Sequence, residues 1–204
     1  MYGATQAGRT WYLHCVKYLL NLGFVASAID PCVFFYKQTI LLLFVDDVII
    51  NNLTTTGLDE AVDLIKDNAD VDDQGEINDY VGVNMTHNDD GSIHMTQPHL
   101  IASILKDVRL TKESKPAPTP ALSTVILHAD LDGEDHDGHF DYRSVIGKLN
   151  YVKKSTRPDI GYAVHQCARF VANPKKSHAQ AVKRIGRYLL ATKNKGYIIK
   201  PDAS

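Results

Sequence analysis

Hydrophobic residues recur at helical spacing along much of the chain. Near the start, an apolar face is followed by Gly23, a typical helix-terminating residue. That face consists of Trp11, Cys15, Leu19 and Leu22. The same spacing predicts helices over residues 58–68, 97–110, 142–152, 160–170 and 174–189. The C-terminal third is therefore expected to be helical.

Residues 40–50 hold two apolar runs separated by Asp46 and Asp47. Their β-branched and aromatic residues predict two buried strands that meet at a tight acidic turn. Buried carboxylates usually face a cation or another partner, because isolated buried charge is costly. A solvated turn is the alternative, since Asp is common in turns. Further strands are predicted over residues 33–36, 80–85 and 93–95, the last two joined by a turn at 88–91.

Composition places the chain among ordinary globular proteins. It has 204 residues, 44% hydrophobic and 23% charged. Residues 2–9 are too polar for a signal peptide, and no stretch is long enough to span a bilayer, so no membrane contact is expected. The three cysteines are too widely spaced for a zinc site or a disulfide framework. A reducing intracellular compartment fits best.

The net charge of −2 conceals a strong asymmetry. Residues 57–94 contain eleven acidic residues and one lysine, whereas residues 142–200 contain fourteen basic residues and one aspartate. The basic part is a candidate polyanion surface, unless its charges are merely scattered and solvated. The candidate contacts to a nucleic-acid backbone are Lys176, Lys183, Arg184 and Arg187, which lie largely off the apolar face of the last helix.

A proline-rich and then acidic segment, residues 115–141, predicts a linker between a part at 1–114 and a part at 142–204. Within it, four carboxylates have offsets that resemble an EF-hand calcium loop: Asp130, Asp132, Glu134 and Asp141. However, Asp135 occupies the position that requires glycine, and no helices flank the loop at the right distance. His136 and His139 are possible metal ligands, although an exposed histidine pair in a loop usually has no such role.

Six blocks follow one another in order along the chain, at residues 2–12, 27–34, 44–47, 75–83, 142–151 with 156–160, and 173–189. Together they resemble reverse transcriptases of copia-type LTR retrotransposons. The first, residues 2–12, is similar to that family's Tyr-Gly-Leu-Lys-Gln-Ala-Pro-Arg-Ala-Trp-Tyr signature, with Gly8 in place of proline. Residues 44–47, Phe-Val-Asp-Asp, resemble its Tyr-Val-Asp-Asp polymerase box, with Phe44 in place of tyrosine.

The resemblance implies an α+β fold: a partial reverse-transcriptase palm, with a small antiparallel sheet and helices, followed by a mainly helical thumb- or connection-like part. The palm and the start of the thumb would occupy residues 1–114, and the basic connection-like region residues 142–204. Asp46 would be a direct ligand of Mg²⁺ or Mn²⁺, and Asp47 its partner, in two-metal nucleotidyl transfer. By the same resemblance, the nucleotide- or template-binding residues are Gly3, Gln6 and Arg9, and the primer-proximal residue is Gly82.

The resemblance also implies partners: an RNA or DNA template–primer duplex and deoxynucleoside triphosphates. The family's remaining metal-binding aspartate and most of its fingers lie upstream of the block at residue 2, and a ribonuclease H domain follows. We therefore expect a polyprotein fragment that is inactive alone and that belongs to a cytoplasmic retrotransposon particle with a possible nuclear phase. Two alternatives remain: a non-catalytic nucleic-acid-binding remnant, and a phosphoacceptor signalling domain, which would need a parallel sheet.

Overall fold

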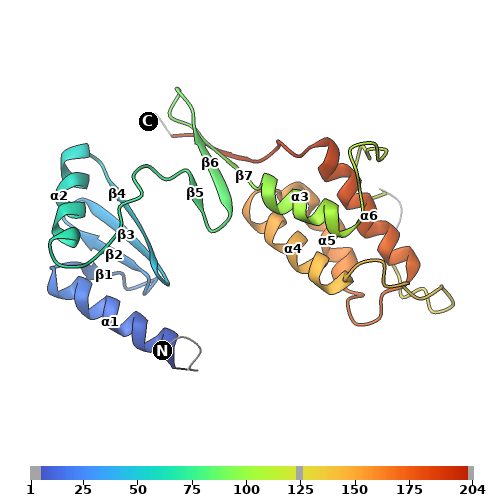
Figure 1. Ribbon diagram of the computed structural model, residues 1–204, viewed down its shortest axis with the longest axis horizontal. Helices are drawn as coiled ribbons and strands as arrows, with labels where there is room; N and C mark the ends of the chain where they lie inside the picture. The colour runs from blue at the N-terminus through green and yellow to red at the C-terminus, as the bar shows by residue number, and fades with distance from the viewer. Residues whose placement is uncertain (1–5, 123–125, 202–204) are drawn as a thin grey trace. The chain divides into compact units, whose positions relative to one another are not determined.

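A computed structural model describes residues 6–122 and 126–201 of the chain. The chain divides into two compact units, residues 1–77 and residues 78–204, and each unit contains an antiparallel sheet with helices (Figure 1). The predicted α+β class is confirmed. No helix among the described residues combines the length and the apolar character needed to cross a membrane.

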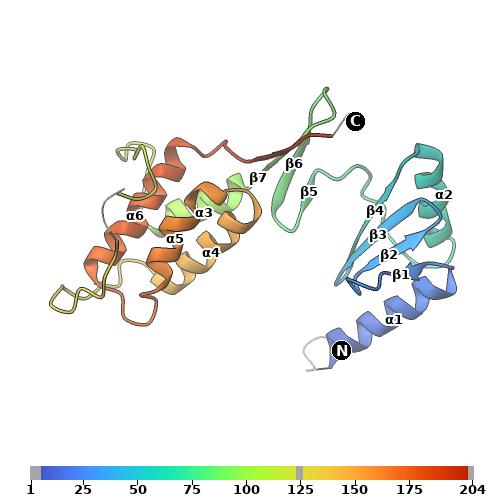
Figure 2. The ribbon, with the colours of Figure 1, turned by 180° about the vertical axis from the view of Figure 1, so that it is seen from behind.

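The first unit is built on a four-stranded antiparallel meander in the order β1-β2-β3-β4 (Figure 2). Its strands are β1 (Val25–Ala26), β2 (Val33–Tyr36), β3 (Thr39–Phe44) and β4 (Asp47–Asn52). Side chains along β3 alternate between buried and exposed, as the pleat of a half-buried strand requires. The buried face packs on α1 (Ala7–Asn21) and α2 (Thr55–Lys66). The shared core comprises Leu19, Phe24, Phe34, Leu41, Leu43 and Ile65.

The helix limits of the first unit follow from local chemistry. α1 is followed by Gly23, whose φ of +92° lies in the left-handed region that glycine tolerates. It begins at Ala7, so Gly8 lies inside the helix. α2 begins three residues before the predicted Leu58, because the Thr54 side chain accepts a hydrogen bond from the Gly57 amide and caps the helix.

The opposite face of the first sheet carries large apolar side chains that no described element covers. Phe35, Ile40 and Leu42 are each between 40% and 44% exposed. The strand pairing places them together, because Phe35 pairs with Ile40, and residues 40 and 42 lie on the same face of one strand. A contiguous apolar sheet face of this kind commonly marks an interaction surface.

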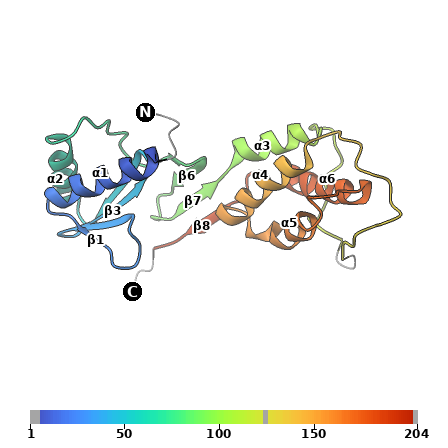
Figure 3. The same cartoon turned by 90° about the horizontal axis from the view of Figure 1, so that it is seen from below.

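The second unit contains the sheet β5-β6-β7-β8. Its strands are β5 (Asp79–Tyr80), β6 (Val83–His87), β7 (Ile93–Thr96) and β8 (Tyr197–Ile199). The single strand predicted over residues 80–85 is wrong, because Tyr80 pairs with Val83 across a two-residue turn. The pairing of β6 with β7 is confirmed. β8, near the C-terminal end, lies beside β7 and was not predicted (Figure 3).

Helices of the second unit enclose the larger core. They are α3 (Pro98–Asp107), α4 (Tyr142–Ser155), the short 3₁₀ helix Pro158–Ile160, α5 (Gly161–Ala168) and α6 (Lys176–Ala191). The most buried residues of this core include Ile101, Ile104, Leu149, Val152, Val164, Ile185 and Leu189. The predicted amphipathic faces therefore point inward.

Residues 115–141 form no helix in their described part, and they pack along the helices of the second unit. The Ala117 amide donates to the Arg187 carbonyl, and Phe140 is buried in the helical core. The Asp135 and Lys175 backbones form an isolated antiparallel bridge.

Candidate functional site

The tip of the β3–β4 hairpin is a two-residue turn made by Val45 and Asp46, while Asp47 pairs with Phe44 as the first residue of β4. The predicted acidic turn is therefore displaced by one residue. Val45 has a φ of +54°, at the position that glycine normally takes in a type II′ turn. A β-branched residue in this region costs about 1–3 kcal/mol and persists only where its surroundings hold it.

Trp11 supplies part of that restraint. Its indole Nε1 donates a hydrogen bond of 2.9 Å to the Val45 carbonyl, and its ring stacks on His14 one turn further along α1. The Tyr12 hydroxyl donates to the Pro31 carbonyl in the loop before β2. The first half of α1 therefore fixes the turn that carries Asp46.

The carboxylates of Asp46 and Asp47 are both exposed, and neither has a hydrogen bond or an ion pair within the described part of the chain. The pKa of the Cys15 thiol on α1 is raised, mainly by burial and further by the negative charge of Asp46. The negative charge of Asp46 therefore acts electrostatically on a side chain of α1. The hairpin tip presents two unpaired oxygen-donor groups on strained, externally anchored backbone.

The other candidate residues of the first unit lie at the start of α1. Gln6 occupies the N-cap position but makes no side-chain cap, and Arg9 is exposed two residues before Trp11. Both side chains are thus available on the helix whose Trp11 holds the hairpin turn. Gly3 lies outside the described residues.

The tight turn between β5 and β6 contains Gly82, with a φ of +74°, preceded by Val81 with a φ of +51°. Positive φ at both central residues is typical of a type I′ hairpin turn. Space around Gly82 is open, because a Cβ there would meet no atom within 4 Å. The Tyr151 hydroxyl on α4 donates a 2.6 Å hydrogen bond to the Val81 carbonyl. Here too an aromatic donor holds the carbonyl of a strained valine.

The basic residues of α6 differ in how they are engaged. Lys176 forms an ion pair with Glu134 at 2.7 Å, and Arg184 donates from Nη2 to the Thr119 hydroxyl at 2.9 Å. Lys183 and Arg187 have no ion pair among the residues that the structure describes, and Arg187 is exposed. Because residues 176, 183 and 187 are seven and four positions apart, they follow one stripe of the helix.

The acidic loop before α4 does not form the calcium site that its spacing resembles. In the described ranges no group of three or more His, Cys, Asp or Glu residues is arranged to hold a metal. Three of its four carboxylates have other partners: Asp130 accepts from Ser177, Glu134 pairs with Lys176, and Asp141 caps α4 by accepting from the Ser144 amide.

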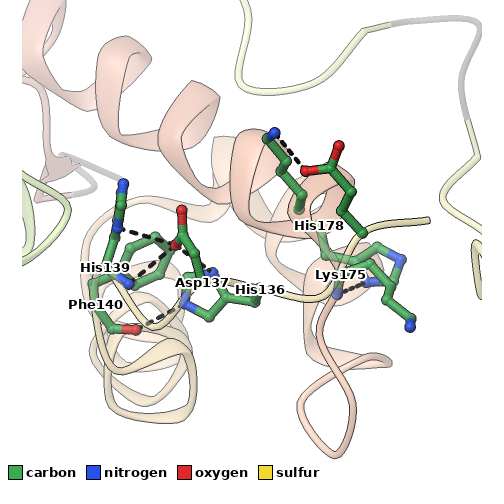
Figure 4. Close-up of polar contacts among 8 residues, drawn as sticks. His136, Asp137, His139, Phe140, Lys175 and His178 are labelled. Carbon is green, nitrogen blue, oxygen red and sulfur yellow. Dashed lines mark hydrogen bonds and ion pairs between the residues drawn. The ribbon is translucent and has the colours of Figure 1, made fainter.

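The two histidines of the loop are also engaged. His136 donates from Nε2 to the Phe140 carbonyl at 2.9 Å (Figure 4). The Nδ1 atoms of His136 and His139 lie 3.6 Å and 3.2 Å from Asp137 Oδ1. The His139 amide also donates to that carboxylate, and this bond is the main reason why the pKa of Asp137 is lowered.

Sequence reasoning assigned Trp11 to a helix face and gave Tyr151 no role. The Trp11 indole donates to a carbonyl 34 residues away in sequence, and the Tyr151 hydroxyl to one 70 residues away, so local periodicity gave no indication of either contact.

The antiparallel pairing of β1–β4 contradicts the phosphoacceptor alternative, which requires a parallel sheet.

Comparison with known proteins gives consistent matches. The family model described as "Reverse transcriptase (RNA-dependent DNA polymerase)" matches residues 1–123. The chain is 33% identical over 204 residues to the retrovirus-related Pol polyprotein from transposon RE1 of Arabidopsis thaliana, covering 98% of this chain and 14% of that protein. It is 31% identical over 209 residues to the polyprotein from transposon TNT 1-94 of Nicotiana tabacum, covering 94% and 15%. No solved structure matches.

The chain thus spans about one seventh of the length of these relatives, which are much larger polyproteins. The family match covers the whole first unit and continues into the second, through both hairpins described above. This chain belongs to the reverse transcriptase (RNA-dependent DNA polymerase) family, in the group carried by the polyproteins of copia-type retrotransposons.

Proposed function

We propose that the chain is part of an RNA-directed DNA polymerase that works within a longer polyprotein, with Asp46 and Asp47 at its nucleotidyl-transfer centre. The observation that carries this proposal is the hairpin tip. Two adjacent carboxylates are exposed and without partners in the described structure, on a turn that is strained and held by Trp11. Strain of this kind gathers at functional sites, where the surroundings keep the backbone in a fixed position.

The donor chemistry of the tip fits Mg²⁺ or Mn²⁺. Magnesium takes oxygen ligands and is usually bound through one or two carboxylates together with waters and substrate phosphates. Asp46 and Asp47 would hold the metal, which when bound would supply positive charge to stabilise the phosphates and help ionise the primer hydroxyl. The chain itself contributes position, because Trp11 fixes the turn and the pairing of Phe44 with Asp47 fixes the start of β4.

The uncovered apolar face of the first sheet supports the polyprotein context. Phe35, Ile40 and Leu42 form a surface that a sheet normally buries. We propose that further polymerase segments, corresponding to the upstream palm and fingers of the longer relatives, pack there. These segments would also supply the remaining metal-binding aspartate.

Nucleic acid is the proposed partner of the second unit. Lys183 and Arg187 on α6 are suited to contact phosphates of a template–primer duplex, and the open turn at Gly82 allows the primer backbone to approach closely. Affinity that rests on such contacts falls as salt rises, because binding releases counterions.

The test is magnesium-dependent primer extension on an RNA template. A version extended upstream, as in the longer relatives, is compared with its Asp46→Asn and Asp47→Asn variants and with Asp59→Asn, an exposed carboxylate on α2. We expect extension by the parent and by Asp59→Asn, and a loss of at least a hundredfold in the other two. Full activity of Asp46→Asn would refute the proposed centre.

A non-catalytic nucleic-acid-binding role is the second candidate, because three basic residues of α6, at positions 176, 183 and 187, lie on one stripe. It predicts salt-sensitive duplex binding by the 204-residue chain, with no extension by either version. Binding measured by fluorescence anisotropy beside the extension assay separates the two functions.

A further inference from the structure

An acidic strap, defined here as residues 130–137, crosses the N-terminal end of α6. Its backbone joins the segment that leads into the helix. The Lys176 amide donates to the Glu134 carbonyl at 2.8 Å, and the His136 amide donates to the Pro174 carbonyl at 3.1 Å. The strap therefore runs as a short antiparallel partner of residues 174–176.

Three successive residues at the helix start bind carboxylates of the strap. Lys175 Nζ lies 2.6 Å from Asp135, and Lys176 Nζ lies 2.7 Å from Glu134. The Ser177 hydroxyl donates to Asp130 at 2.5 Å. The pKa values of Asp135 and Lys176 shift as pairing requires: the side-chain bond to Lys175 lowers that of Asp135, and the bond to Glu134 raises that of Lys176. The strap therefore places anionic groups where α6 is most positive.

The region before the strap and the C-terminal end of the strap are both held in place. His178 is fully buried and stacks on Phe170, with 4.0 Å between ring centroids. Its Nδ1 accepts from the Lys175 amide (Figure 4), and its Nε2 donates to the His128 carbonyl just before the strap. At the other end, His136 donates to the carbonyl of the buried Phe140. The strap is therefore part of the fold.

The start of a helix attracts anions, since its free amides and its dipole both favour negative charge. Here carboxylates already occupy that position and pair with both lysines, so a nucleic-acid phosphate would meet like charge and paired cations. We propose that the strap closes the N-terminal turn of α6 to nucleic acid, and that phosphates contact only the later part of the stripe, at Lys183 and Arg187. This inference rests on the proposed nucleic-acid binding and defines the limit of that surface.

The first test is the salt dependence of duplex binding by the full chain. Each phosphate contact contributes about 0.9 to the slope of log affinity against log salt concentration. We expect Arg187→Ala to reduce the slope by about 0.9 and Lys176→Ala to leave it unchanged. Equal reductions in the two variants would overturn the proposal, because Lys176 would then contact phosphate despite the strap.

The second test removes single charges from the strap. Glu134→Gln frees Lys176, whereas Asp132→Asn removes the same charge from an exposed residue with no partner in the described structure. We expect Glu134→Gln to steepen the slope by about 0.9 and to raise affinity at least threefold over Asp132→Asn. Identical behaviour of the two variants would show that only net charge matters. Circular dichroism checks that both variants retain their helices.

These outcomes separate the inference from the function on which it rests. If the wild-type chain binds no duplex but Glu134→Gln does, the strap blocks the surface and the proposed binding at Lys183 and Arg187 is wrong. If neither binds, both proposals fail.

Discussion

The indole of Trp11 donates a hydrogen bond to the carbonyl oxygen of Val45 over 2.9 Å. The bond joins the first half of α1 to the β3–β4 turn. Of the two central residues of that turn, Val45 is the one with a positive φ. The second unit repeats the arrangement with different residues, since the Tyr151 hydroxyl donates to the carbonyl of Val81 at the β5–β6 turn. In both places a helix holds a hairpin in a conformation that valine disfavours.

Replacement of Trp11 by phenylalanine keeps the aromatic ring and removes the donor. We expect the free energy of unfolding of the first unit to fall by about 1 kcal/mol, the usual net value of one hydrogen bond. Urea denaturation followed by circular dichroism measures the change. Leu13→Ala is the matched control, because Leu13 is 54% exposed on the same helix. An unchanged Trp11→Phe midpoint would mean that the bond does not restrain the turn.

Replacement of Val45 by glycine tests the strain directly. Glycine adopts a φ of +54° without penalty, so relief of about 1–3 kcal/mol should exceed the roughly 0.5–1 kcal/mol of added chain entropy in the unfolded state. We expect the hairpin to become more stable. The single tryptophan, Trp11, reports on this site, so urea unfolding can be followed by its fluorescence. A fall in stability would argue against backbone strain at the tip.

The thiol of Cys15 provides a readout of charge at the hairpin tip that does not depend on activity. Burial and then Asp46 raise its pKa, so Asp46→Asn should lower the pKa and increase the rate of alkylation at pH 8. The effect is modest because burial is the larger cause. A Cys32→Ser background isolates Cys15, since burial raises the pKa of Cys167 to about 12.

The same assay reports metal binding. Mn²⁺ or Mg²⁺ held by Asp46 and Asp47 would offset their charge and should speed alkylation of Cys15 in the parent, but not in an Asp46→Asn/Asp47→Asn variant. Asp59→Asn should behave as the parent. Equal metal effects in all three proteins would exclude binding at the tip.

Asp159 makes the second unit sensitive to acid. Burial raises its pKa, but hydrogen bonds from Arg157 and Tyr188 outweigh burial and leave the pKa below its usual value. The stabilisation is therefore complete above the unfolded pKa of about 3.9 and is lost as pH falls through the lower folded pKa. Acid titration of stability should show a smaller loss in Asp159→Asn than in the parent, and the remaining loss comes from other carboxylates of the unit with lowered pKa values, such as Asp135 and Asp137.

At neutral pH, Asp159→Asn should also lower the free energy of unfolding by about 3 kcal/mol. This is near the lower end of the values for breaking a buried ion pair, because Asp159 is partly exposed. The loss arises at Arg157, whose side chain is only 2% exposed and would keep an uncompensated charge. Tyr188→Phe removes one hydrogen bond to Asp159 without altering charge, so it should cost less. Equal losses would contradict a charge-based origin.

Periodicity predicted the helices well because each buries one apolar face, and it located the Asp46–Asp47 hairpin because apolar strands flank it. It failed where distant contacts override local preference. Val81 is a poor turn residue, yet Tyr151 holds its carbonyl and the strand bends there. The acidic strap resembled a free linker, because its partners at residues 175–177 lie some forty residues further along the chain.

The pairing of β7 with β8 has a consequence for the order in which the protein folds. β8 follows α6, so the ribosome must make the whole helical part, residues 98–191, before β7 acquires its second neighbour. At roughly 5–20 residues per second this interval is on the order of ten seconds. Throughout it the newly made β6–β7 hairpin presents an open hydrogen-bonding edge, on which strands of neighbouring nascent chains can add. Rapid local folding of α3 to α6 would shorten this exposure by delivering β8 as soon as it emerges.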